Sequence, residues 1–210
     1  MRDTLRLLGI RASCLILLKR IFRIHRVLIL KLNLSGFQPR SFERIPGGEL
    51  CLLTPEDIPP LLSAVPYLGG EDRRELLARV HFYNLGFTRL YAIRKDGEIA
   101  CIQWLITPED NPVIRTRYRR LFFELRPGQA MLENVFTFPK YRGLGYLPTL
   151  SQRLLVQARE MGFHAVIAYI PEDKITSLNE FVNMGFRFFN LLRIIQIFGF
   201  VRRKLLLPRV

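Results

Sequence analysis

The sequence has few of the residues that build metal centres and disulfide frameworks. Its 210 residues include three cysteines and three histidines, all widely separated, with no C-x-x-C pair and no His/Cys cluster. This excludes the common structural zinc motifs and a disulfide-stapled fold, and predicts buried thiols, a reducing compartment and no bound metal. The cysteines are Cys14, Cys51 and Cys101, and the histidines are His25, His81 and His164.

Long apolar runs are also missing near the N-terminus. The run from Cys14 to Leu18 is far shorter than the roughly 20 residues that a membrane-spanning helix needs. A signal peptide would need small residues at its cleavage site, and Lys19-Arg20 follows the run instead. We therefore expect a cytoplasmic protein that does not cross a membrane.

Acidic residues are scarce relative to basic ones. The chain has 18 Asp and Glu against 32 Lys and Arg, a net charge of +14. This balance favours an anionic partner, such as nucleic acid, an anionic membrane or a phosphorylated ligand. Nucleic acid is the least favoured of the three, because no RNP box, zinc finger or similar motif accompanies the charge.

Residues 1–26 combine apolar and basic residues at helical spacing. Wound as a helix, positions 2, 6, 9, 13 and 20 fall along one polar stripe beside a broad apolar face. The basic residues of the segment are Arg2, Arg6, Arg11, Lys19, Arg20 and Arg23. The pattern predicts a basic amphipathic helix, preceding a domain of residues 27–210. It either lies on an anionic membrane surface, at the inner face, or docks on the protein's own core or a partner.

The remaining sequence alternates between strand-like and helix-like stretches. Residues 26–34 repeat with a period of two, and residues 71–85 have a helical pattern that ends at Gly86. Residues 87–94 and 98–106 form a hairpin pattern. Further strands and helices follow, and two apolar antiparallel strands, turning near Gly199 or Asn190, finish the chain. Together these elements predict an α/β fold with a mixed sheet.

The stretch of residues 107–128 is longer than a hairpin loop needs. It contains four arginines around Tyr118, namely Arg115, Arg117, Arg119 and Arg120. Two interpretations remain open for it: a flap that contacts substrate or membrane, and a solvated basic segment.

A strand, a glycine-rich turn and a helix follow one another between residues 131 and 161. Gly143 and Gly145 remove side chains where the chain turns into the helix. Backbone N–H groups, the positive end of the helix dipole and Arg142 can therefore converge on a phosphate. The turn lacks the lysine and spacing of a P-loop, and Pro148 stands at the last position of a G-x-G-x-x-G pattern.

This turn resembles the acyl-CoA pyrophosphate loop of the GNAT acyltransferase superfamily, which has the pattern Arg/Gln-x-x-Gly-x-Gly/Ala. Its flanks are similar too. The preceding strand ends at Pro139, and the strand from His164 to Ile170 follows the helix. A second helix closes on Asn183-Met-Gly-Phe186, similar to the superfamily's terminal Gly-Phe signature. The resemblance covers roughly residues 130–187 and implies a GNAT-like fold with acetyl-CoA or another acyl-CoA as donor.

The resemblance also implies where the donor binds. The strand pairs along the pantetheine through Phe136, Thr137 and Phe138, and the loop binds pyrophosphate through Arg142, Gly143, Leu144, Gly145, Tyr146 and Leu147. Two positions depart from the superfamily's pattern. Leu147 replaces its last Gly or Ala, and Phe181 replaces the tyrosine that usually protonates the leaving thiolate.

Glu133 is the predicted general base. The resemblance supports it, because polyamine acetyltransferases of the superfamily carry a glutamate at a matching strand position, and apolar surroundings would raise its pKa. It shares strand parity with Val135 and Thr137, and its alternative role is an ion pair with an arginine. Tyr169, on the strand after the loop helix, is the predicted acid in place of Phe181.

These residues predict an acyl-CoA-dependent N-acyltransferase, most simply an N-acetyltransferase, that acts on an amine at a membrane surface. The departures at Leu147 and Phe181 favour an alternative, a non-catalytic GNAT-like module that binds CoA or a protein partner. The acceptor amine cannot be identified from the sequence.

Overall fold

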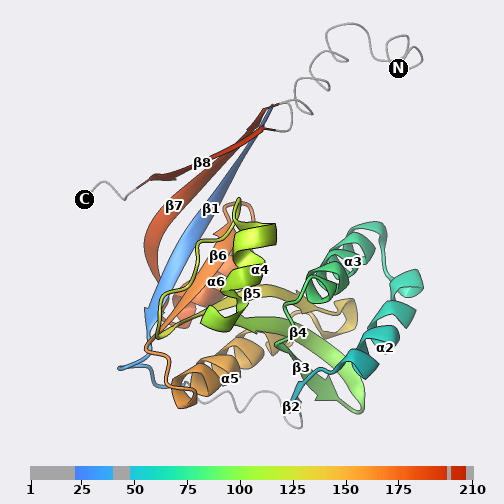
Figure 1. Cartoon of the computed structure of the whole chain (residues 1–210). Helices are drawn as coiled ribbons and strands as arrows, with labels where there is room; N and C mark the ends of the chain where they lie inside the picture. The colour runs from blue at the N-terminus through green and yellow to red at the C-terminus, as the bar shows by residue number, and fades with distance from the viewer. Residues whose placement is uncertain (1–21, 40–47, 198–199, 207–210) are drawn as a thin grey trace, which may run out of the picture.

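The structure, a computed structural model, describes residues 22–39, 48–197 and 200–206 (Figure 1). The strands are β1 Phe22–Asn33, β2 Glu49–Leu52, β3 Leu90–Lys95, β4 Glu98–Ile106, β5 Gln129–Thr137, β6 Ala165–Pro171, β7 Arg187–Ile197 and β8 Phe200–Leu206. The helices are α2 Ile58–Ser63, α3 Gly70–Asn84, α4 Asn111–Val113, α5 Tyr146–Glu160 and α6 Ile175–Asn183. Short 3-10 turns cover Pro55–Asp57, Val65–Tyr67, Pro108–Asp110 and Pro139–Tyr141, and a π-helical turn covers Ile114–Tyr118.

The eight strands form one mixed sheet in the order β2-β3-β4-β5-β6-β1-β7-β8. All neighbouring strands are antiparallel except β5 and β6, which run parallel. The predicted hairpin is confirmed as β3 and β4, joined at Asp96 and Gly97, which both have positive φ as a tight turn requires. The predicted α/β fold with a mixed sheet is therefore confirmed.

Apolar layers cover both faces of the sheet. On one face, α2, α3 and residues 111–125 pack over Trp104 and Met131. On the other face, α5 and α6 pack over Leu105 and Leu132. The helices α3 and α5, which are far apart in the sequence, thus lie on opposite faces of the sheet around β5. This strand is at the centre of the molecule (Figure 1).

The N-terminal strand is longer than the sequence predicts and lies inside the sheet. It begins at Phe22, so residues 22–26 are strand rather than the end of the predicted helix. Cross-strand pairing explains the difference. Ile24 lies opposite Ile195 of β7, and this contact with a distant strand favours extended backbone over the helix that the local spacing predicts. The remainder of the predicted helix, residues 1–21, lies outside the described residues.

Residues 107–128 are anchored by aromatic side chains. The Tyr118 ring stacks on Phe122, with 5.5 Å between ring centroids, and meets Phe82 edge-on at 5.0 Å. Arg115 pairs with Glu124, and the other four arginines of the stretch are exposed. The backbone of this segment is therefore packed on the sheet, while its cations face solvent.

Candidate active site

A β-bulge interrupts β5 beside its partner β4. Ile102 lies opposite Phe136 and Trp104 opposite Glu133, so two residues of β5 face the single residue Gln103. Asn134 takes a left-handed conformation with φ of 54°, which asparagine adopts more readily than most residues. The extra residue changes the alternation of side chains, so Glu133 lies on the same face as Trp104 and Phe136. The predicted shared parity of Glu133 with Val135 is therefore wrong.

Arg79 of α3 holds this bulge in place. Its Nε donates to the Asn134 carbonyl at 3.0 Å and its Nη2 donates to the Val135 carbonyl at 2.8 Å. The guanidinium also lies over the Phe136 ring, 5.2 Å from the centroid, and 3.3 Å from the Glu75 carboxylate. A planar cation thus satisfies two carbonyl groups that the bulge removes from the ladder with β4.

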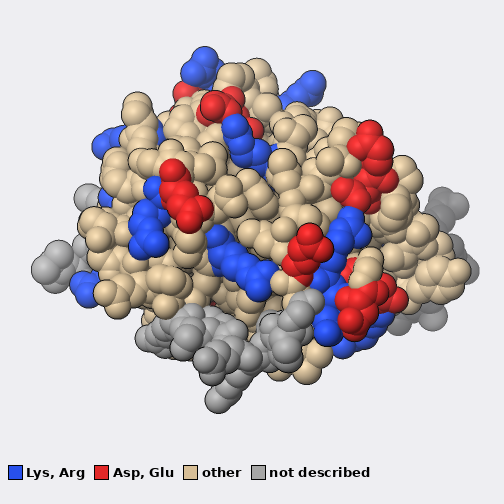
Figure 2. All heavy atoms as spheres, turned by 90° about the horizontal axis from the view of Figure 1, so that it is seen from below, with Lys and Arg blue, Asp and Glu red and all other residues tan. Residues whose placement is uncertain are grey.

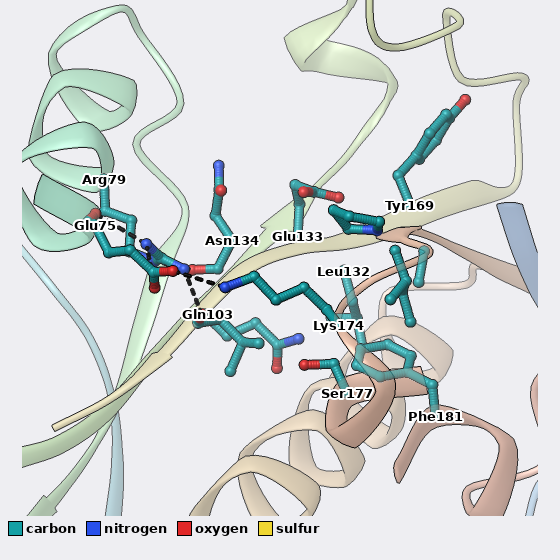
Figure 3. A pocket seen from close by; sticks show the side chains of 14 residues that line it. Glu75, Arg79, Gln103, Leu132, Glu133, Asn134, Tyr169, Lys174, Ser177 and Phe181 are labelled. Carbon is teal, nitrogen blue, oxygen red and sulfur yellow. Dashed lines mark hydrogen bonds and ion pairs between the residues drawn. The ribbon is translucent and has the colours of Figure 1, made fainter. Parts of the chain in front are cut away.

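Beyond the bulge, β5 separates from β6 and a cavity of about 210 Å³ lies between them. The parallel pairing of the two strands ends at Leu132 and Ala168. Figure 3 shows the side chains that line this space, which we call the Glu133 cavity. They include Glu133 and Asn134 from β5, Tyr169 from β6, and Lys174, Ser177 and Phe181 from the following loop and α6.

Glu133 is a half-buried residue whose carboxylate has an altered pKa. Burial raises the pKa of this side chain to about 8, although backbone hydrogen bonds with Asn134 and Tyr169 and the nearby Arg79 cation oppose the shift. Its Oε2 atom has no solvent contact and no hydrogen-bond partner among the described residues. A carboxylate with these properties can accept a proton near neutral pH, as general-base chemistry requires.

A second cavity of about 510 Å³ lies next to the first, between α3, the end of β5, the Tyr141–Pro148 loop and α6. We call it the donor cleft. It shares the lining residues Glu75, Val135, Lys174 and Ser177 with the Glu133 cavity. The two spaces therefore adjoin at the bulge, and an elongated ligand in the cleft can reach Glu133.

The loop that forms one side of the donor cleft has the conformation expected for anion binding. Gly143 and Gly145 have φ of 74° and 81°, and Gly145 caps the start of α5. A Cβ at Gly143 would meet nothing within 4 Å, so the space outside the loop is open. The first N–H groups of a helix have no partner within it, and Tyr146 and Leu147, the first two residues of α5, line this end of the cleft.

Arg142 already has an acidic partner in this structure. Its guanidinium forms an ion pair with Asp72 of α3, donates to the Thr137 carbonyl at 3.2 Å and lies over the Phe136 ring at 5.9 Å. Lys174 pairs in the same way with Glu75, at 2.9 Å (Figure 3). Both cations of the donor cleft therefore hold carboxylates of α3, and a bound phosphate would have to compete with Asp72 for Arg142.

Comparisons with known proteins identify the fold. No protein-family model matches the sequence, and no curated protein matches it. Among solved structures, a glucosamine N-acetyltransferase region of a fungal multi-domain GH3 β-N-acetylglucosaminidase matches with a TM-score of 0.64 and 14% identity, covering 89% of this chain and 23% of that one. A GCN5-related N-acetyltransferase from Sphaerobacter thermophilus matches with a TM-score of 0.57 and 12% identity, covering 97% of this chain and 59% of that one. A putative GNAT acetyltransferase from Novosphingobium aromaticivorans matches with a TM-score of 0.51 and 19% identity, covering 82% of this chain and 65% of that one.

The chain has the GNAT fold. It spans less than two thirds of the length of each of these three proteins. At these identities the matches establish the GNAT fold alone, and the roles of individual residues rest on the geometry described above.

Tyr169 lies at the edge of the site in this GNAT fold. Burial raises the pKa of its phenol to about 12, so the group is protonated at neutral pH. The Phe123 N–H donates to its hydroxyl at 3.2 Å, and the ring packs on Phe122. Figure 3 shows the hydroxyl pointing away from Lys174 and Ser177. Phe181, the position that departs from the superfamily's pattern, lines the Glu133 cavity with an apolar ring.

Sequence reasoning missed three polar residues that line the Glu133 cavity of this GNAT fold. Arg79 and Lys174 come from surface-like helical and loop sequences, where nothing distinguishes them from solvated cations. Gln103 is fully buried, and its Oε1 accepts a hydrogen bond from Ser151 while its Nε2 has no partner among the described residues. A polar residue inside the apolar run of 99–106 was the available signal, because buried amides need partners.

Cys101 does not contribute a reactive thiol. It is fully buried, and burial raises the pKa of its thiol to about 12. Cys51 is partly buried, and Cys14 lies outside the described residues. In the part of the chain that the structure describes, no group of three or more His, Cys, Asp and Glu side chains could hold a metal ion.

Proposed function

We propose that this chain is an acyl-CoA-dependent N-acyltransferase, most simply an N-acetyltransferase, that transfers the acyl group to an amine. The observation that carries the proposal is the junction of the donor cleft with the Glu133 cavity at the β5 bulge. An acyl-CoA whose pyrophosphate rests on residues 142–147 and whose pantetheine follows Phe136–Phe138 would bring its thioester to this junction. The GNAT fold supports this orientation.

Glu133 would act as the general base in this reaction. An amine reaches the enzyme mostly as an ammonium ion, which must lose a proton before its nitrogen can attack the thioester carbonyl. A carboxylate with a pKa of about 8 is well matched to that proton. Tyr169, which is protonated at neutral pH, is our proposed source of the proton for the departing thiolate, reached by a local shift of its hydroxyl away from Phe123.

The direct test measures thiol release from acetyl-CoA with a panel of amines, by colorimetric detection of free CoA. The panel should include a polyamine, an amino acid and glucosamine, the last because one structural neighbour is a glucosamine N-acetyltransferase region. Mass spectrometry of the product then identifies the acylated amine. The Gly145→Glu variant, which puts a side chain and a negative charge against the pyrophosphate, should weaken CoA binding in calorimetry. Unchanged affinity would refute the loop assignment.

A second candidate function is a non-catalytic module that binds CoA or a protein partner. It is favoured by the apolar Phe181 in the Glu133 cavity and by the carboxylates of α3 that occupy Arg142 and Lys174. CoA would stabilise such a module against thermal unfolding without any amine-dependent thiol release. Thermal stabilisation by CoA without amine-dependent thiol release would therefore identify the non-catalytic module, whereas thiol release would identify the enzyme.

We further propose that residues 1–26 bring the protein to the anionic inner face of a membrane. The support is their basic and apolar composition, since apolar burial supplies binding and each cation near an anionic surface adds about 1 kcal/mol. None of the described helices is long and apolar enough to cross a bilayer. Deletion of residues 1–21 should release the protein from anionic vesicles in flotation. Equal flotation of both proteins would favour the alternative of a docked helix.

A further inference from the structure

Three strands form an arm that extends beyond the rest of the sheet. Pairing of β1 with β6 begins at Val27, so residues 22–26 of β1 pair only with β7, and β7 pairs in turn with β8. We define the arm as residues 22–26, 193–197 and 200–204. Figure 1 shows it rising past the helices, with the end of β7 and the start of β8 near its tip.

One face of the arm packs on the protein. Arg203 donates to the Phe122 carbonyl at 3.0 Å, and its guanidinium lies 4.2 Å from the centroid of the Phe123 ring. Leu192 and Ile194 on the neighbouring strand belong to the same core face. Arg203 therefore ties this face of the arm to residues 122–123.

The opposite face carries apolar side chains at its tip. The register aligns Ile24 with Ile195 and Ile197 with Phe200, so these residues share one face. Phe200 is 82% exposed, and Ile24 and Ile197 are each about two-fifths exposed. A cluster of exposed large apolar residues at the end of a projecting element is typical of a surface that contacts another phase or partner.

A row of cations crosses the same face below this tip. Arg26 lies opposite Arg193, and Arg193 lies opposite Lys204. Like charges directly across neighbouring strands repel one another, and within the described residues this row has an ion pair with one carboxylate, Glu172, 3.5 Å from Arg26. The Nε of Arg193 is buried without a hydrogen-bond partner among the described residues. The row thus concentrates three cations beside one carboxylate, and an anion would offset their mutual repulsion.

Charge along the whole of β1, β7 and β8 points the same way. The three strands contain eight basic residues and no acidic one, namely Arg23, Arg26, Lys31, Arg187, Arg193, Arg202, Arg203 and Lys204. On the face seen from below, remote from the arm, acidic and basic side chains lie beside one another (Figure 2). These three strands are therefore purely basic in their charged residues, in contrast to the face seen from below.

We propose that the arm docks edge-on into an anionic phospholipid bilayer. The cationic row meets the lipid phosphates, and the apolar tip enters the boundary between headgroups and acyl chains. The dimensions agree, because the tip lies two to four residues beyond the row, about 7–14 Å at the rise of a strand. Interfacial elements are buried about 5–10 Å at this boundary. The proposal extends the membrane part of the proposed function and does not depend on acyl transfer.

The test uses the full chain with the variant Arg193→Gln, Arg202→Gln and Lys204→Gln, whose residues are exposed or half-buried on the arm. Each cation contributes roughly fivefold to partitioning onto an anionic surface, so the triple variant should bind phosphatidylserine vesicles about a hundredfold more weakly. The matched control neutralises Arg117, Arg119 and Arg120, which are exposed on the body, and should lose far less. Wild-type binding by the arm variant would overturn the proposal.

Insertion of the tip has its own measurement. Phe200→Trp should be quenched by brominated lipids, whereas Tyr67→Trp, at a residue that is 90% exposed on the body, should not be. Trp104, the single native tryptophan, is fully buried and gives a constant background. Absence of quenching at position 200 would refute insertion. Two other results would also refute insertion. One is self-association through the tip, seen as a dimer that Phe200→Ser dissociates, with no vesicle binding. The other is an arm that binds oligonucleotides but not vesicles.

These results also separate the arm from the N-terminal segment. If deletion of residues 1–21 leaves flotation unchanged while the arm variants abolish it, the arm alone binds lipid. If the deletion abolishes flotation and the arm variants do not, the proposal for the arm fails and that for the segment holds.

Discussion

Glu133 is held where its charged form is costly, and its proposed role as general base predicts a pH dependence of activity. Because burial raises its pKa to about 8, we expect kcat/KM of the wild type to rise with pH through an ionisation near that value. Glu133→Gln should lower the rate by roughly 10²–10⁴ and remove that ionisation from the pH profile. Full activity of the variant at neutral pH would exclude the role of general base.

The same residue predicts a pH dependence of stability. Its folded-state pKa of about 8 exceeds the ordinary value of 4.5, so the folded state holds the proton more tightly. The stability this contributes is complete below about pH 4.5 and is lost as the pH rises through 8. Glu133→Gln should therefore match the wild type near pH 4 and unfold at a higher temperature at pH 8. Glu71→Gln, at an exposed carboxylate, is the matched control in thermal melts.

In the proposed donor complex, Asp72 would compete with the pyrophosphate for Arg142. Removing its charge should free the guanidinium for pyrophosphate, so Asp72→Asn should tighten CoA binding about two- to fivefold, the size expected for a surface ion pair. Glu71→Gln removes a carboxylate from the same cleft without releasing Arg142, and separates this effect from a general change in charge. Calorimetry decides it, and weaker binding by Asp72→Asn would contradict the competition.

Among the secondary-structure elements, β5 depends on the turn that precedes it. Gly128 has φ of 75°, accepts hydrogen bonds from the N–H groups of His164 and Ala165, and a Cβ there would lie 2.2 Å from the His164 ring. Gly128→Ala should cost more stability than the 1–2 kcal/mol of the left-handed conformation alone. Gly97 has a similar φ of 80°, and a Cβ there would meet nothing within 4 Å. Gly97→Ala therefore measures the cost of the left-handed conformation alone, and chemical denaturation of the two variants gives the comparison.

The elements that local pattern specifies were predicted from the sequence. Helical spacing located α3, the turn residues located the β3–β4 hairpin, and the two glycines located the start of α5, because each signal acts over a few residues. The bulge at Asn134 was not predicted, since asparagine occurs in many extended segments and the two-for-one pairing depends on β4. For the same reason the clamp by Arg79, which lies 55 residues away in the chain, has no local signal.

The molecule as a whole depends on β1, which pairs with β6 on one side and β7 on the other. Its alternating leucines predicted a strand, but no sequence pattern states where a strand stands in a sheet. Deleting residues 1–21 should leave a folded domain with cooperative unfolding, whereas deleting residues 1–33 should abolish it, because β7 and β8 then lose their attachment. Circular dichroism melts of the two truncations check this, and a cooperative melt of the shorter protein would contradict it.

The central position of β1 also has a consequence during synthesis. The strand leaves the ribosome well before its partners β6 and β7, which lie more than 130 residues further along the chain. At about 5–20 residues per second, on the order of ten seconds pass before Val27–Asn33 can meet Ala165–Pro171. Throughout that interval an apolar strand is exposed without its partners, so this chain is expected to engage chaperones while it is still nascent.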